Sequence, residues 1–241
     1  MRLLGKQPVR YDPRTLRMER YIPKWPALPS AADWSQGRKH WGNMLNETLG
    51  DCTVAAAGHL IMNWTQNASS LVTPTDGDIL GAYKAITGYR EEDPSSDTGA
   101  VELNVLNYWR NVGIAGHKIA GYVKLQLDSL HLKLAIHLFG GAYTGVLLPK
   151  NFERQLDAGQ DWSFDPKYPP DDNSGHAIPA IAYDQAGVTF LTWGQRQKAT
   201  WEWVTACLDE AYAVLAPEWV NGPNAPNAFD LAALQNDLKL L

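Results

Sequence analysis

A helix that begins at a cysteine is the feature that most constrains the fold of this chain. From Cys52 onward, apolar residues recur at the spacing of one helix face, and no proline interrupts the pattern before Pro74. Gly50 and Asp51 supply the turn before it. We predict a mostly buried helix over residues 52–66, and its apolar positions are Val54, Ala57, Leu60, Ile61 and Trp64.

The position of Cys52 in the first helical turn allows two interpretations. The free N–H groups and the positive end of the helix dipole favour a thiolate there, which is what a nucleophilic cysteine needs. Cysteine is also a small apolar residue that often begins a core helix without any chemistry. Only Cys52 and Cys207 are present, so one disulfide is possible but a disulfide framework is not.

Composition and charge exclude several classes of protein. The 241 residues, 45% of them hydrophobic, suit one large domain or two lobes. A formal net charge of −5 argues against a general nucleic-acid binder, and no apolar run could span a membrane. The first residues lack the apolar stretch of a secretion signal, so we expect a cytoplasmic or virion-associated protein.

Residues 1–33 predict an extended arm, because they contain five prolines and show no sustained period. Residues 1–24 hold seven basic and two acidic residues, while the rest of the chain is acidic. The arm could therefore lie on the acidic body, or it could contact a protein partner.

The remaining pattern places helices first and strands second. We predict helices from 73–76 through Ile86, at 100–111 and at 128–139, with a strand-like piece at 119–125. Strands follow at 142–148, 177–183, 188–193 and 211–215, and residues 184–187 form a hairpin connection. We predict loops at 87–100 and 157–175. A short helix is predicted at 200–208, and a last helix at 227–240 is capped by Asn227. This order indicates an α+β fold with segregated helical and antiparallel sheet lobes.

A nucleophilic cysteine needs a base, and His176 is the best candidate. It follows a glycine and a polar loop at the head of a predicted strand. His59 lies about two helical turns beyond Cys52, roughly 10 Å along the axis, and the other histidines occupy an apolar helix or polar segments. No Cys-x-x-Cys or His-x-x-x-His is present, so we expect no metal site, and no motif indicates a cofactor.

An ordered set of motifs resembles the papain-like cysteine peptidases. Asp33-Trp34 precedes the cysteine, as an Asp-Trp pair does near the mature start of those enzymes. The run from Asn46 through Gly50 to Cys52 resembles their Gln-x-x-x-Gly-x-Cys. Residues 174–178 resemble the start of their catalytic-histidine strand, and Thr192-Trp193-Gly194 resembles the end of their Asn-Ser-Trp-Gly motif. The resemblance covers roughly residues 33–216.

The resemblance implies a role for each matching residue. Cys52 would be the nucleophile, His176 the base, Asn46 a donor to the oxyanion, and Trp193 a shield over the pair. Leu191 stands where the family has the asparagine that orients the histidine, and Thr192 is the nearest polar substitute. Further substitutes are Asp171, Asp172 and Asn173. Asp51 would put a negative charge beside the nucleophile.

The sequence thus predicts a papain-like two-lobe fold with a helical lobe at about 46–140 and an antiparallel sheet or barrel lobe at about 141–216. Residues 34–216 would form this domain, between the arm and a C-terminal extension at 217–241 that contains a helix. The implied function is that of a hydrolase, a thiol protease acting on peptide or protein substrates through a Cys-His dyad.

Two other functions stay open. The missing asparagine and the long arm also fit a catalytically weak or inactive structural or binding protein with the same fold, for example a virion or assembly component. A cell-wall amidase of the NlpC type also uses a cysteine at a helix start, although those domains are shorter.

Overall fold

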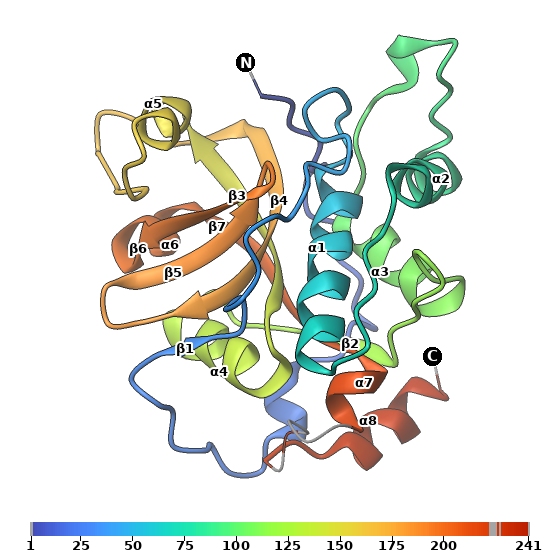
Figure 1. Cartoon of the computed structure of the whole chain (residues 1–241). Coiled ribbons are helices and arrows are strands. Elements are labelled where there is room, and N and C mark those ends of the chain that lie inside the picture. The colour runs from blue at the N-terminus through green and yellow to red at the C-terminus, as the bar shows by residue number, and fades with distance from the viewer. Residues whose placement is uncertain (1, 222–225, 227, 241) are drawn as a thin grey trace.

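The computed structural model describes residues 2–221, 226 and 228–240. The molecule has a helical side and a sheet side (Figure 1). Three helices, α1 (Cys52–Asn67), α2 (Asp76–Thr87) and α3 (Glu102–Asn111), form one side, and an antiparallel sheet forms the other. α1 runs between them and packs against β4 of the sheet. It is buried on all faces from Cys52 to Thr65, and its sequence accordingly contains no Asp, Glu, Lys or Arg.

The predicted helices of this side are confirmed. α2 begins at Asp76, and Thr75 caps it. The Thr75 side chain accepts from the N–H of Asp78, while the Asp78 carboxylate accepts from the N–H of Thr75. α3 begins at Glu102, two residues later than predicted.

The sheet has the order β2-β7-β3-β4-β5-β6, with β1 paired to β4 off this path, and every pairing is antiparallel. It is open, so the barrel alternative for this lobe is not realised. The strands are β1 (Ala32–Asp33), β2 (Gly121–Lys124), β3 (Ala142–Pro149), β4 (Pro170–Tyr183), β5 (Gly187–Thr192), β6 (Gln195–Thr200) and β7 (Leu208–Leu215).

Short helices cover the sheet and its ends. α4 (Ser129–Phe139) packs on β7 and β4, and Asp128 caps it as its sequence suggests. The others are α5 (Phe152–Asp157), α6 (Trp201–Cys207), α7 (Pro217–Val220) and α8 (Leu231–Leu238), with single 3-10 turns η1 (Met18–Tyr21) and η2 (Pro94–Ser96). Two apolar cores result, one between α4, α6 and the sheet, the other around α1. The predicted domain boundaries remain predictions. No helix in the described part of the chain is long and apolar enough to cross a membrane.

Several predicted boundaries are wrong. β4 begins at Pro170, so the second part of the predicted 157–175 loop is strand. The sequence pattern predicts no element for β6 or α5, because β6 is a polar strand on the edge of the sheet and α5 is a short helix. α8 begins at Leu231 with Asp230 as its cap, and the predicted cap Asn227 lies outside the described residues.

The arm is mostly extended, and it is tied to the body at several places. β1 pairs with the end of β4, η1 buries Met18 and Tyr21 in the sheet-side core, and Leu16 and Arg17 are held to Lys124. The first stretch of the chain, residues 2–7, also binds the body, and we call it the leading segment. It passes close to the start of α1 (Figure 1).

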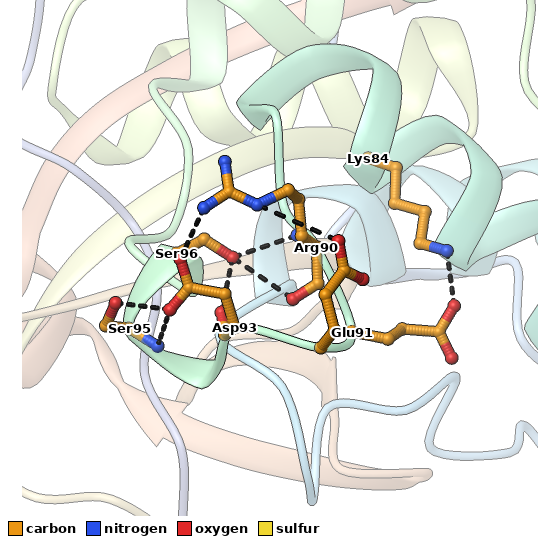
Figure 2. A network of polar contacts seen from close by, with 7 residues as sticks. Lys84, Arg90, Glu91, Asp93, Ser95 and Ser96 are labelled. Carbon is orange, nitrogen blue, oxygen red and sulfur yellow. Dashed lines mark hydrogen bonds and ion pairs between the residues drawn. The ribbon is translucent and has the colours of Figure 1, made fainter.

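The loop between α2 and α3 is held by polar contacts at the surface. Arg90 pairs with Asp93, whose carboxylate also accepts from Ser95, and Ser96 bonds back to Arg90, while Lys84 pairs with Glu91 (Figure 2). Asp97 at its end accepts from the N–H of Gly50, 2.9 Å away, and from the Tyr83 hydroxyl. These bonds join the loop to the turn that precedes Cys52.

Candidate active site

Cys52 is the first residue of α1 and is 1% exposed. The Asp51 carbonyl accepts from the N–H groups of Val54 and Ala55, which starts the helix. The N–H of Ala177 donates to the sulfur at 3.4 Å, and the N–H of Gly5 also lies beside it. Burial raises the pKa of the Cys52 thiol to about 12 despite these donors, so the sulfur is protonated at neutral pH in this arrangement.

His176 lies on β4, opposite Val146 of β3, and is 1% exposed. Its Nε2 is 2.8 Å from the Thr192 hydroxyl, and its Nδ1 has no hydrogen-bond partner among the described residues. Burial lowers the pKa of His176 to about 3, so the ring is neutral. The N–H of the next residue, Ala177, donates to the Cys52 sulfur, so the β4 backbone beside His176 lies against Cys52.

The residues around the imidazole come from the β5–β6 turn. The Trp193 ring stacks on the His176 ring with centroids 4.3 Å apart and planes within 9°. Trp193 has a φ of 44°, the left-handed region, and Gly194 follows with a φ of 72°, which makes the tight turn that places the indole over the histidine. Leu191 is buried in the apolar core around α1, so Thr192 is the polar side chain of β5 at the ring. The other predicted substitutes, Asp171 to Asn173, lie at the far start of β4, and the Asp171 carboxylate accepts from Asn173.

Asn46 and Asp51 lie buried beside the start of α1. The Asn46 amide donates to the carbonyl of Leu49 at 3.2 Å. Both Asp51 carboxyl oxygens are buried with no hydrogen-bond partner in the described part of the chain. Burial raises the pKa of Asp51 to about 8, and the nearby Asn46 amide opposes that rise. Asp51 is therefore largely neutral at pH 7.

The leading segment lies directly over Cys52. The Ala100 N–H donates to the Gly5 carbonyl at 2.8 Å, the Gln7 N–H to the Ala100 carbonyl at 2.9 Å, and the Lys6 N–H to the Gly175 carbonyl at 3.2 Å. A Cβ on Gly5 would collide with the carbonyl of Gly50, so only glycine fits this approach. The leading segment thus binds Ala100 on the helical side and Gly175 on β4, close to Cys52 and His176.

Arg2 and Lys6 anchor the two ends of the leading segment. The Arg2 guanidinium lies 5.4 Å from the Trp193 ring centroid and pairs with Asp157 at 2.7 Å. Lys6 is 6% exposed, and its ammonium meets Asp209 and Glu210 of β7, with Glu102 of α3 nearby. Nothing in the sequence singled out these residues, although the basic arm and acidic body pointed to such contacts. The described residues contain no cluster that could hold a metal ion.

Several solved structures have a fold similar to that of this chain. The structure is similar to xylellain, a cysteine protease from Xylella fastidiosa, with a TM-score of 0.67 and 15% identity over 90% of this chain and 98% of that one. It is also similar to the cysteine protease CMS1MS2 of Carica candamarcensis, with a TM-score of 0.56 and 13% identity over 78% of this chain and 99% of that one. A further similar structure is bromelain of Ananas comosus, with a TM-score of 0.54 and 12% identity over 78% of this chain and 100% of that one. No model of a known protein family and no curated protein matches the sequence. The chain has the fold of the papain-like cysteine proteases.

Proposed function

We propose that this protein is a cysteine peptidase that uses Cys52 and His176 as a dyad. The His176 Nδ1 takes the Cys52 proton, and the sulfur attacks the carbonyl carbon of a peptide bond. The imidazolium then gives its proton to the leaving amine as the C–N bond breaks. Water hydrolyses the resulting thioester and restores the thiol.

The surroundings of the imidazole support this assignment of protons. Nε2 is engaged by Thr192, while Nδ1 is free of any bond in the described structure. A hydroxyl that accepts from Nε2–H leaves Nδ1 as the lone-pair nitrogen, which is the form a base requires. Trp193 covers one face of the ring and keeps it in position. Thr192 would thus act as the positioning residue.

The oxyanion would be stabilised by the Cys52 N–H and the Asn46 amide. The first lies at the uncapped N-terminus of α1, where the backbone N–H groups lack helical acceptors. Asn46 has one amide hydrogen that is not bonded to Leu49. We propose that this hydrogen points to the oxyanion once substrate replaces the leading segment.

The observation that carries the proposal is the meeting of two features that structural needs alone do not explain. An uncapped helix start presents Cys52, and a strand of the other lobe brings a histidine oriented by Thr192 and Trp193. In the covered form both groups are neutral, because burial opposes both charges. Departure of the leading segment would admit water and substrate, which lowers the pKa of Cys52 and raises that of His176.

Replacement of each cysteine tests the mechanism. Cys52→Ala should abolish cleavage of denatured casein and of a mixed peptide library, while Cys207→Ala, which removes the other buried thiol, should retain it. Both are assayed in the otherwise wild-type chain and in a chain with Lys6→Met, which weakens the leading segment. Cleavage that persists in Cys52→Ala would sink the dyad.

A second candidate is a papain-fold binding or assembly protein without turnover. The covered Cys52 and the leucine, Leu191, at the position of the orienting asparagine favour it. Alkylation of the two thiols by iodoacetamide separates the candidates. A Cys52 that reacts much faster than Cys207 in the Lys6→Met chain supports the peptidase, whereas equal and slow reaction supports the binding protein. Digestion of cell wall without peptide cleavage would instead indicate an amidase.

A further inference from the structure

The side chain of Lys6 enters a strongly acidic site inside the protein. Its ammonium contacts Asp209, lies 3.2 Å from Glu210 Oε1 and 3.3 Å from the Gln7 carbonyl. Glu102 completes the site from α3. We call Glu102, Asp209 and Glu210 the acidic site. Gly145 of β3 forms its floor, because a Cβ there would collide with both the Lys6 side chain and the Glu102 carboxyl.

The acidic site holds more carboxyl groups than its occupant can pair with. Three carboxyl groups face one ammonium, and Glu102 and Glu210 are both 0% exposed. Both Glu102 oxygens have no hydrogen-bond partner among the described residues. Burial opposes the charged form of Lys6, but the carboxylates of Glu102 and Glu210 outweigh it and raise the pKa of the ammonium. Buried carboxyl groups without a cation are costly, so the site demands a basic occupant.

The residue of the leading segment that enters the acidic site directly follows the residue that lies beside Cys52. Gly5 lies beside the Cys52 sulfur, and Lys6, the next residue, turns its side chain into the site. The main chain of Lys6 donates to Gly175, the residue before His176, and the neighbouring peptide groups pair with Ala100. Hydrogen bonds to main-chain atoms do not depend on side chains, so these edges could hold other extended peptides that have glycine at the position of Gly5. The acidic site is then the place where side-chain identity is read.

We propose that the acidic site is the specificity site of this peptidase, that it selects a lysine or arginine side chain of the substrate, and that Lys6 occupies it in cis. This inference rests on the proposed function for the reaction, but the binding preference stands on the site itself. Arginine should bind at least as well as lysine. Its five N–H donors can reach the Glu102 oxygens that the three donors of Lys6 leave without a bond.

A first experiment measures the preference in cis, through the protection of Cys52. The full chain is alkylated with iodoacetamide, and the rate at Cys52 is read by mass spectrometry with Cys207 as the internal reference. Lys6→Met, which keeps the apolar stem and removes the charge, should raise the Cys52 rate at least tenfold. Lys6→Arg should leave it unchanged, and Lys24→Met is the control because Lys24 is an exposed lysine of the same arm. Lys6→Ala serves as a second variant if the methionine chain does not fold.

A second experiment supplies the side chain in trans. A synthetic peptide with the sequence of residues 2–9 is added to the Lys6→Met chain, with Lys, Arg or Leu at the position of Lys6. The Lys and Arg peptides should restore the protection of Cys52, and the Leu peptide should not. Glu210→Gln should remove this discrimination, whereas Glu202→Gln, an exposed glutamate on α6, should retain it.

A cleavage assay then separates this inference from the function on which it rests. In the Lys6→Met chain, peptides with Arg or Lys at one position should be cleaved at least tenfold faster than those with Leu, and Glu210→Gln should abolish the difference. Discrimination in binding without any cleavage would refute the peptidase and keep the acidic site as a basic side-chain receptor. Cleavage with no basic preference, or equal protection by the Leu and Lys peptides, would overturn the specificity site.

Discussion

Two helices of the same side of the molecule begin in opposite ways. At α2, Thr75 and Asp78 exchange hydrogen bonds with each other's backbone, and these bonds lower the pKa of the Asp78 carboxyl. At α1, Asp51 occupies the cap position, but its side chain bonds no helix N–H, and its carboxyl is buried with no hydrogen-bond partner among the described residues. The first N–H groups of α1 are therefore left open next to Cys52.

The difference separates a helix start whose donors are satisfied from one whose donors stay open, as the proposed peptidase chemistry requires. A satisfied cap uses the N-terminal donors, and a helix that must present those donors to an oxyanion cannot use them up. The cost appears at Asp51, whose pKa is raised to about 8. Four changes would break or sharpen this comparison.

The largest expected effect is that of Asp51→Asn on stability. The folded chain holds the Asp51 proton more tightly than the unfolded chain, so this contribution to stability is full below about pH 4 and is lost as pH rises through about 8. At pH 9 the variant should be about 2–4 kcal/mol more stable than wild type, since a pKa unit corresponds to about 1.4 kcal/mol and relaxation reduces the full value. Urea unfolding at pH 4 and pH 9 measures it.

The matched control for that change is Asp78→Asn at the start of α2. Its carboxyl has a lowered pKa because of Thr75, so its stabilisation is present at pH 7 and is lost in acid. This variant should therefore lose stability at pH 9. The same sign for both substitutions would show that the two helix starts do not differ as described.

The reactivity of Cys52 should respond to the same substitution. Burial is the main cause of the raised pKa of Cys52, and the charge of Asp51 adds to it. Since Asp51 is neutral at pH 6 and charged at pH 9, Asp51→Asn should speed alkylation of Cys52 by about 3- to 10-fold at pH 9 and leave it unchanged at pH 6. An equal effect at both values would mean that Asp51 acts by packing, not by charge.

A smaller effect is expected at the satisfied helix start. Thr75→Ala removes the hydroxyl that accepts from the Asp78 N–H and should lower the free energy of unfolding by about 1 kcal/mol, as loss of an N-cap does. Thermal unfolding measures it. The rate of Cys52 alkylation should stay at the wild-type value, and a change there would link α2 to the active site.

The smallest effect is expected for Lys84→Met near the end of α2. Lys84 pairs with Glu91 in the exposed network of Figure 2, where water screens the attraction. The Tm should not change measurably. The Lys6→Met variant is the buried counterpart, and a comparable loss in the two variants would deny that burial distinguishes the acidic site.

Much of the fold could be predicted from the sequence because local signals were strong. α1, α2 and α4 have apolar residues at helical spacing, and Thr75 and Asp128 mark two of their starts. The polar strand β6 carries no apolar alternation, since only Gln197 and Ala199 are buried in it, and it lies at the edge of the sheet. Its formation depends on pairing with β5, which no local pattern reveals.

The candidate site was only partly readable for a similar reason. Cys52 and His176 belong to motifs that the sequence shows. Thr192 was a candidate because it is the polar residue next to Leu191. The leading segment binds through the main chain of Gly5 and Gln7, which leaves no side-chain signature. Glu102 resembles an ordinary acidic residue in a first helical turn, and only the fold reveals that it is fully buried against Lys6.

The tether behind the leading segment has a consequence for any competitor. Leu16 and Arg17 are held to Lys124, so only about ten residues separate this anchor from Lys6. A displaced segment would remain near Cys52 at an effective concentration on the order of millimolar, as short flexible linkers give. A free peptide must therefore exceed this local concentration or bind much more tightly, and a cut within residues 8–15 would remove the advantage permanently.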